Sequence, residues 1–151
     1  MEFTIKSDLD MEGLSEVYKT CAELEKKVHA GVFTPRNATI AEANEREFGF
    51  INDENIFVPS RSTVRLPLEM AEEQIRERAL SKLTELTPQA ASAAVDELGK
   101  QAVIAMETAF DTQGYGQWAD NAPYTIRRKG RNEPMVDTGE LRSSYKYEKQ
   151  E

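Results

Sequence analysis

Residues 87–110 read TPQAASAAVDELGKQAVIAMETAF, and this stretch decides the fold. Thr87 is a favourable helix cap and Pro88 is tolerated at the first helical position, so a helix is predicted over 89–110. Gly99 weakens it by about 1 kcal/mol relative to alanine, and the sequence shows no reason for that glycine. The inward face is mostly small: Ala91, Ala94, Leu98, Ala102, Ala105 and Ala109. Such a face predicts a closely packed helix pair and not a cofactor site.

Two further amphipathic helices are predicted, each with apolar residues at steps of three and four opposite a charged face. The one just before residue 87 carries Leu68, Ala71, Ile75, Ala79, Leu83 and Leu86. The other follows a cap at Asp8 or Asp10 and carries Leu14, Val17, Tyr18, Cys21 and Leu24. Cys21 is the single cysteine, which excludes an intramolecular disulfide, and we interpret it as a small buried side chain.

Short strands are expected where apolar and β-prone residues alternate or cluster, at 2–6, at 28–34 and at 145–148. His29 is expected to face solvent or a neighbouring strand. Together these elements predict an α+β fold in which a small mixed or antiparallel sheet packs against amphipathic helices. We expect one domain, 1–151, with a C-terminal interaction segment at 111–148 and a polar tail at 149–151.

The region between the first strands and the helix pair is predicted to be a short helix followed by a long central loop. Thr39 and Glu42 have the spacing of a capping box, and the helix is expected to end at Phe48-Gly49. The loop spans 50–66. Its apolar side chains are Phe50, Ile51, Ile56, Phe57 and Val58. They are costly to leave in water, and the sequence leaves open whether the same subunit or a neighbouring copy covers them.

The segment 117–144 reads QWADNAPYTIRRKGRNEPMVDTGELRSS. Residues 124–126 form a short β-prone run, and the basic cluster 127–131 is predicted to be the exposed tip of a loop. Two possible caps then precede a single helical turn with an apolar side chain that points inward. The expected structural anchors of the segment are Trp118, Asp137, Thr138, Gly139 and Leu141.

This segment resembles a known family. Trp118, Thr125, the pair Lys129-Gly130 and the run 134–144 are similar to the C-terminal signature of the tail-completion and head–tail joining (neck) proteins of tailed bacteriophages. That group includes tail terminator-like proteins and is also described as virion morphogenesis proteins.

A second stretch of the chain resembles the same family. Residues 40–49, followed by 58–65, are similar to its pattern of alanine, asparagine, glutamate, phenylalanine and glycine before a step of proline, small residue and arginine. The chain departs from the pattern in two places. Arg46-Glu47 is inserted, and Ser62-Thr63 stands where members often carry Pro-Phe.

The resemblance implies a tail terminator-like fold and a structural virion protein that forms a ring, commonly of six copies, at the neck or the head-proximal end of the tail. It implies assembly in the host cytoplasm, with further copies and other neck, connector or tail-tube proteins as partners. DNA would pass through the lumen without specific binding. The candidate interface residues are Phe50, Ile51, Ile56, Phe57, Val58, Arg61, Arg65, Arg127, Arg128, Lys129, Arg131 and Arg142.

The charge distribution helps to decide between a structural virion protein and a nucleic-acid-binding protein. The net charge is −8, while residues 111–151 hold seven acidic and seven basic side chains, so the whole excess lies in the first 110 residues. An acidic body repels nucleic-acid phosphates, which argues against a dedicated DNA-binding protein. The alternative is a nucleic-acid-binding accessory protein that uses the 127–131 cluster beside Tyr124 and Trp118.

Nothing in the sequence favours an enzyme, a cofactor or a metal site. No metal-binding spacing is present. Cys21 and His29, the single histidine, lie eight residues apart and do not form a dyad on one helix face. Carboxylates distant in sequence can still meet in space. No apolar run has the length of a membrane span, and the first residues lack a signal-peptide pattern, so no export is expected.

Overall fold

The computed structural model describes residues 11–150 and is an α+β protein, as the sequence predicts. This range contains six helices and four strands, which make two small antiparallel sheets. The elements are α1 (Met11–Leu24), β1 (Lys27–Val32), α2 (Pro35–Asn44), β2 (Phe50–Ile51), β3 (Phe57–Val58), α3 (Arg65–Leu80), α4 (Pro88–Asp111), α5 (Pro123–Lys129), α6 (Glu140–Ser143) and β4 (Tyr145–Gln150). The expected strand at 2–6 and the Asp8 or Asp10 cap lie outside the described residues.

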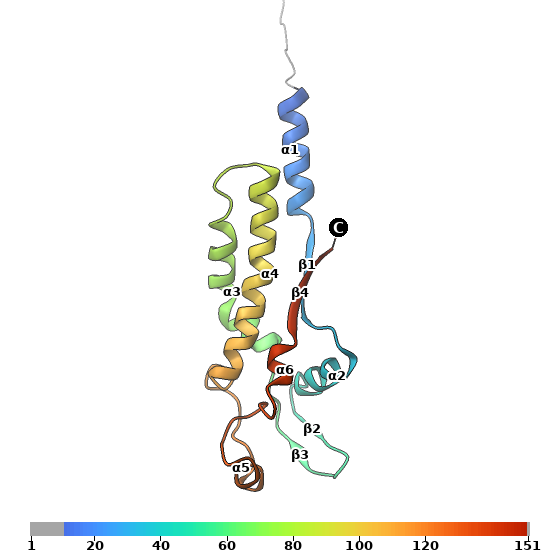
Figure 1. Cartoon of the computed structure of the whole chain (residues 1–151), viewed down its shortest axis with the longest axis vertical. Coiled ribbons are helices and arrows are strands. Elements are labelled where there is room, and N and C mark those ends of the chain that lie inside the picture. The colour runs from blue at the N-terminus through green and yellow to red at the C-terminus, as the bar shows by residue number, and fades with distance from the viewer. Residues whose placement is uncertain (1–10, 151) are drawn as a thin grey trace, which may run out of the picture.

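The helix α4 is the centre of the molecule, with α3 beside it and β1 and β4 across from it (Figure 1). The predicted cap is confirmed, because Thr87 Oγ1 accepts a hydrogen bond of 3.2 Å from the backbone N–H of Ala90. The predicted small-residue face is also confirmed, except that Leu98 is 44% exposed. The buried alanines of α4 are Ala91, Ala94, Ala102, Ala105 and Ala109.

The larger sheet joins the two ends of the described chain. Strand β1 pairs with β4 in an antiparallel register that runs from Lys27 opposite Gln150 to Val32 opposite Tyr145. The predicted final strand is therefore confirmed, and it extends into the region expected to be a polar tail. His29 is exposed and lies opposite Glu148, as expected of a strand residue with a solvated side chain.

The approach of α4 to this sheet explains Gly99. A Cβ atom at Gly99 would lie 2.7 Å from Cγ of Tyr147 and 2.8 Å from Cγ1 of Val28. Real Cβ contacts are not that short, so a larger side chain would force the helix and the sheet apart. The glycine sets the spacing between α4 and the sheet, which the sequence alone does not reveal.

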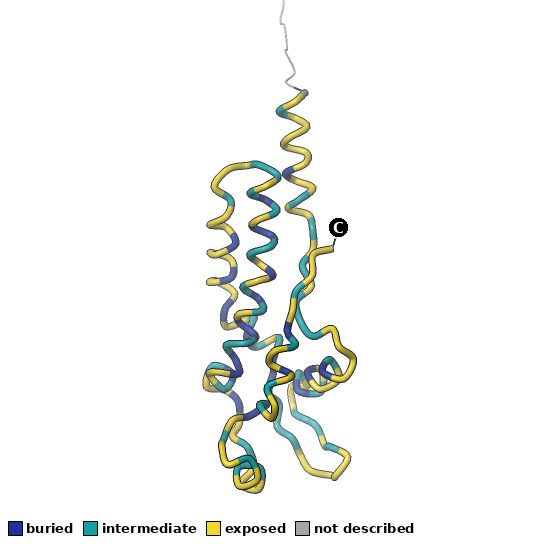
Figure 2. Tube along the Cα trace, in the orientation of Figure 1, coloured by how far each residue is buried: buried dark blue, intermediate teal, exposed yellow. Residues whose placement is uncertain are grey.

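The molecule is elongated, with a helical end and a loop end (Figure 1). At the helical end α1 runs beyond the turn between α3 and α4, and at the opposite end lie α5 and the β2–β3 hairpin. Buried positions follow one side of α4 and gather where α4, β4 and the loops meet (Figure 2). The main hydrophobic core consists of Met106, Ala109, Phe110, Trp118, Leu141 and Tyr145.

Two helix boundaries differ from the sequence prediction. Helix α2 begins at Pro35 and ends at Asn44, so the expected capping box at Thr39 is wrong. Proline at the first helical position starts the helix five residues earlier, after a cap at Thr34, and the Thr39 hydroxyl donates to the Pro35 carbonyl within it. Helix α3 ends at Leu80, so the last part of its predicted stripe falls in the following turn, where Leu86 is 80% exposed.

The stripe predicted for α1 forms on a helix but does not face the core. Leu14, Val17, Tyr18 and Leu24 are all exposed, and Cys21 is exposed as well, so its interpretation as a buried side chain is wrong. The helix packs on the rest of the chain through its polar side instead.

The region predicted as a β-prone run and a loop tip is the helix α5. Pro123 occupies its first turn, and Gly130 closes it in the left-handed conformation with φ of 71°. These two residues give the segment a favourable helix start and end, which outweigh the strand preference of 124–126. The cationic side chains therefore sit on the last turn of a helix and on the residue after its cap.

Candidate functional site

Residues 40–49 and 58–65, the two parts of the second stretch that carries the family resemblance, meet at the end of α2. Both carboxylate oxygens of Glu45 accept hydrogen bonds from the segment that starts α3. The donors are Ser62 Oγ at 2.6 Å, the backbone N–H groups of Thr63 at 2.5 Å, Val64 at 2.7 Å and Arg65 at 3.2 Å, and Thr63 Oγ1 at 3.3 Å. Val64, at the cap position, has no side-chain oxygen. Glu45 therefore caps α3 from a distant part of the chain.

Arg61 is a structural residue of the same junction. Its side chain is 7% exposed, and it donates to the carbonyls of Ala119, at 2.9 Å from Nε, and Asp120, at 2.8 Å from Nη2. Burial lowers the pKa of Arg61, and the nearby Asp120 carboxylate opposes that shift. Arg61, a candidate interface residue, is therefore buried within the chain, where its guanidinium holds two backbone segments together.

Trp118 closes the junction from the other side. Its indole N–H donates to the Ser62 carbonyl at 3.0 Å, and its ring meets Phe110 edge-on with 5.4 Å between ring centres. Gly114 lies under the indole with φ of 65°, where a Cβ atom would overlap the ring. Trp118 is 6% exposed and is a core residue, as the sequence predicts.

Tyr145 connects this junction to the sheet. Its hydroxyl donates to Thr63 Oγ1 at 2.6 Å, and its ring packs near Phe110. The residues that the family pattern contributes, together with Tyr145, therefore form one buried hydrogen-bonded network. This network fixes α2, α3, the 117–121 segment and β4 relative to one another. We call Glu45, Arg61, Ser62, Thr63, Trp118 and Tyr145 the buried junction.

The buried junction predicts a loss of stability at high pH. Burial raises the pKa of Tyr145 to about 12. The unfolded chain ionises this phenol near pH 10, so the stabilisation is complete below pH 10 and is lost as the pH rises through 12. We expect the free energy of unfolding to fall by about 2–3 kcal/mol across this range on account of Tyr145. Urea unfolding at pH 9 to 12 measures it.

The matched variant for this measurement is Tyr145→Phe. Its stability is expected to fall less steeply over the same pH range. Burial also raises the pKa values of Tyr115 and Tyr147, so part of the fall remains in the variant. Identical pH profiles for the two proteins would contradict the assignment to Tyr145.

The predicted cationic cluster divides into two pairs. Lys129 Nζ donates to the Val136 carbonyl at 2.6 Å, and Arg131 donates to the Asp137 carbonyl at 2.9 Å and pairs with Glu133 at 3.0 Å. These contacts hold the loop that leads to α6. Arg127 and Arg128 are exposed, and no ion pair or hydrogen bond of either side chain is present within residues 11–150.

The 137–141 segment leads into α6 much as the sequence predicts. Asp137 and Thr138 are exposed, and Thr138 Oγ1 accepts a hydrogen bond of 3.3 Å from the Glu140 N–H. Gly139 precedes the helix with φ of 83°, and Leu141 is buried in the core. Of the expected anchors here, Leu141 packs inward, while Asp137 contributes through its backbone carbonyl.

The region 50–66 contains a short hairpin instead of a wholly irregular loop. Strands β2 and β3 pair through Phe50 opposite Val58 and Ile51 opposite Phe57. Asn52 Oδ1 accepts hydrogen bonds from the N–H groups of Glu54 and Ile56 and so shapes the turn. The exposed apolar side chains around the hairpin are Phe48 at 84%, Ile51 at 66%, Ile56 at 54% and Phe57 at 62%. Phe50 and Val58 are half-buried.

A hollow of about 490 Å³ separates the hairpin from the start of α5. Apolar and aromatic side chains, including Phe57 and Tyr124, line it together with Asp53, Glu54 and Arg128. Tyr124 is 68% exposed. The hairpin and α5 thus form one surface, the hairpin–α5 surface, in which apolar groups lie next to unpaired arginines.

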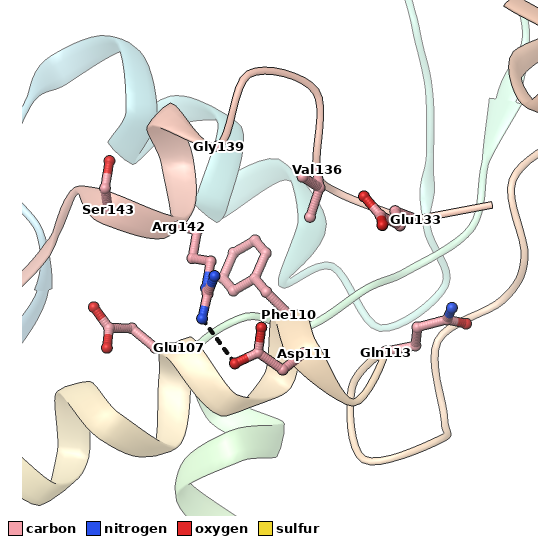
Figure 3. Close-up of a pocket in the computed structure, with 9 residues that line it drawn as sticks. All are labelled: Glu107, Phe110, Asp111, Gln113, Glu133, Val136, Gly139, Arg142 and Ser143. Atoms are coloured by element: carbon pink, nitrogen blue, oxygen red, sulfur yellow. Dashed lines mark hydrogen bonds and ion pairs between the residues drawn. The ribbon is translucent and has the colours of Figure 1, made fainter. Parts of the chain in front are cut away.

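A second hollow, of about 600 Å³, lies between the end of α4 and α6 (Figure 3). Arg142 reaches from α6 to Asp111, with 2.7 Å between Nη2 and Oδ2, beside the ring of Phe110. Glu107 and Glu133 also line it. Among the described residues no group of three His, Cys, Asp or Glu side chains could hold a metal ion.

Two of the predicted interface arginines form exposed ion pairs within the chain. Arg142 pairs with Asp111, and Arg65 pairs with Glu69, one helical turn away, at 3.2 Å. Such pairs at the surface contribute little stability, about 0–1 kcal/mol each, so both arginines stay accessible to other partners.

Sequence reasoning missed Glu45 and Tyr145 as key residues. Glu45 stands within the quoted family pattern, but its partners lie about twenty residues further on, at a helix start whose cap residue, Val64, has no side-chain acceptor and where Ser62 Oγ accepts from the Leu66 N–H at 2.8 Å. That missing cap at Val64 is the signal that indicates a remote acceptor. Tyr145 carries no comparable signal, because only the folded chain brings it to Thr63.

Comparison with protein-family models, with curated protein sequences and with solved structures gives no match for the chain. None of the helices between residues 11 and 150 combines the length and apolar character needed to cross a membrane.

Proposed function

We propose that this chain is a structural protein of a tailed-phage virion. In this proposal it has a tail terminator-like fold and forms an oligomeric ring, with six copies expected, at the neck or the head-proximal end of the tail. It acts there in tail completion, tail termination or head–tail joining, after assembly in the host cytoplasm. Its partners are further copies and neck, connector or tail-tube proteins, while DNA passes through the lumen without specific binding.

The observation that carries the proposal is the hairpin–α5 surface. Phe57, Ile51 and Ile56 are each more than half exposed, next to Phe48 and Tyr124. Several exposed apolar side chains around one hollow are typical of protein–protein contact, because burial of apolar area is worth about 25 cal/mol per Å². Arg61 of the buried junction also lines the hollow at this surface. The junction therefore holds the backbone here in place, while the exposed side chains are accessible to a partner.

The charges beside this surface favour a protein partner. Arg127 and Arg128 have no intrachain partner in the described residues, whereas Lys129 and Arg131 are engaged with backbone carbonyls. The chain as a whole carries −8. Two free arginines on an acidic subunit fit the acidic surface of another copy better than DNA phosphate.

The test is the substitution Phe57→Asp. The residue is exposed, so the subunit should stay folded, while a charge placed in a buried contact should abolish assembly. Native mass spectrometry measures the oligomer, and electron microscopy of a complemented mutant phage shows whether heads and tails join. We expect loss of the wild-type oligomer and unjoined particles. The control is Leu80→Asp, which changes an equally exposed side chain at the other end.

Wild-type mass or normally joined particles with Phe57→Asp would overturn the proposal. The nucleic-acid alternative is checked on the same protein, by DNA binding at low salt with and without the double change Arg127→Ala and Arg128→Ala. Binding that is tight in the wild type, weakens steeply with salt and vanishes in the variant would favour the alternative. Absence of binding in both is the expected result.

A further inference from the structure

Helix α1 packs on its own chain through its polar side. Between Glu12 and Leu24, Thr20 is the buried residue of this helix, at 3% exposed. Its hydroxyl lies 2.9 Å from the Glu16 carbonyl and 3.5 Å from the Leu86 carbonyl. The apolar side is turned to solvent, with Leu14 at 55%, Val17 at 56%, Tyr18 at 77% and Leu24 at 43% exposed. A helix that buries threonine and exposes leucine indicates a missing partner.

The spacing of the exposed residues indicates what kind of partner is missing. Leu14, Val17, Cys21 and Leu24 follow one another at steps of three, four and three. This is the a/d spacing of a helix that packs along another helix. We call these four residues, with the adjacent Tyr18, the α1 stripe.

The position of α1 adds a second argument. The N-terminal half of the helix extends beyond the turn between α3 and α4 (Figure 1). From Glu12 to Tyr18 the residues are exposed, apart from the half-buried Gly13 (Figure 2). Isolated helices shorter than about 12–15 residues are marginal in water. A fourteen-residue helix whose apolar side is exposed therefore gains stability from contacts on that side.

We infer that the α1 stripe packs against the α1 stripe of a second copy of this chain. A partner helix needs an exposed apolar stripe of matching spacing, and α1 is the one helix in the described range that presents it. From the exposed fractions, complete burial of the stripe would remove on the order of 500 Å² per copy, or about 1,000 Å² in a pair, which is the small end of the range for specific contacts.

This contact is distinct from the hairpin–α5 surface, at the opposite end of the molecule. It rests on the proposed function only in that the partner is another copy. It adds a helix-to-helix contact to the assembly, and copies joined by it have their helical ends together.

The single cysteine makes the contact directly testable. Cys21 lies near the middle of the stripe, so two copies of it are close whether the helices run parallel or antiparallel. A short bis-maleimide, added to the reduced full-length protein, is expected to give a dimer on a denaturing gel. Cys21→Ala should give none. Val17→Glu should reduce the dimer about tenfold or more, because it puts a charge into the apolar contact. Lys19→Glu, on the other side of α1, should not.

A second reporter keeps the outcome clear. Leu14→Cys in the Cys21→Ala background moves the thiol two turns along the same stripe. It is expected to cross-link when the two helices run parallel, whereas antiparallel helices place residue 14 opposite residue 24, and Leu14→Cys then cross-links with Leu24→Cys. If native mass spectrometry shows oligomers but neither position cross-links, this inference is overturned and the proposed function stands. Cross-linking that Val17→Glu does not reduce reflects collision and would also overturn it. A monomer that does not cross-link would contradict both.

Discussion

Replacing Glu45 by alanine is expected to lower the free energy of unfolding by about 3 kcal/mol or more, because buried donors that lose their only acceptor cost about 1–3 kcal/mol each. The backbone N–H groups of Thr63 and Val64 and the Ser62 hydroxyl all point to this carboxylate. Helix α3 would also lose the negative charge at its N-terminus. Urea unfolding at neutral pH, followed by circular dichroism, measures the change.

Two controls define the cause of that loss. Glu47→Ala removes an exposed carboxylate two residues away and should change stability by less than about 0.5 kcal/mol. Glu45→Gln keeps one oxygen acceptor. Its free energy of unfolding should lie between those of Glu45→Ala and the wild type. A Glu45→Ala protein as stable as the Glu47→Ala protein would show that the cap does not hold α3.

Trp118→Ala is expected to destabilise the protein by about 3–5 kcal/mol, the usual range for removing a buried large aromatic side chain. The change leaves a cavity beside Phe110 and removes the hydrogen bond to the Ser62 carbonyl. Tyr124→Ala is the matched control, since Tyr124 is 68% exposed. Thermal unfolding measures both variants. The midpoint temperature of Trp118→Ala should lie well below that of Tyr124→Ala, which should stay near the wild type.

A third variant separates the ring from its N–H group. Trp118→Phe keeps an aromatic ring but leaves the Ser62 carbonyl without its donor. An intermediate loss of stability is expected. A loss as small as that of Tyr124→Ala would mean that the indole N–H and the size of the ring contribute nothing, contrary to the structure.

The sequence predicted the elements whose neighbours along the chain define them. The alanine face of 89–110 repeats with the helical period and is bounded by Thr87 and Pro88, so α4 and its cap were both predictable. The strand preference of 28–34 and 145–148 likewise predicted strands of a mixed or antiparallel sheet, and the structure shows that they pair antiparallel. Local pattern failed at α5, where Tyr124, Thr125 and Ile126 favour a strand but Pro123 and Gly130 bound a helix.

The candidate site was predictable in part only. The apolar residues of 50–58 stood out in the sequence, and whether the same chain or a neighbour covers them depends on distant segments. Arg61 and Arg128 look alike in sequence, yet Arg61 is buried and donates to two backbone carbonyls, whereas Arg128 faces solvent. Their difference arises because residues 119 and 120 pass beside Arg61 in the folded chain, which no local pattern encodes.

The α1 stripe shows the limit of periodicity. Its spacing predicted a helix with one apolar side, and that helix is present. Periodicity does not say which surface the apolar side meets, and Thr20 makes the intrachain contact in its place. An amphipathic pattern therefore identifies a face that needs a partner, whether that partner belongs to the same chain or to another.

The pairing of β1 with β4 has a consequence for the order of folding. Almost the whole described chain lies between Lys27 and Gln150, so β1 waits through most of synthesis for its partner strand. Helices α3 and α4 are neighbours in sequence and can pair as soon as residue 111 has left the ribosome. Local pairs form quickly and distant strand pairs slowly, so the sheet should close last. A nascent chain that stops before Tyr145 would hold a helix pair and an open strand, a state exposed to aggregation and proteolysis.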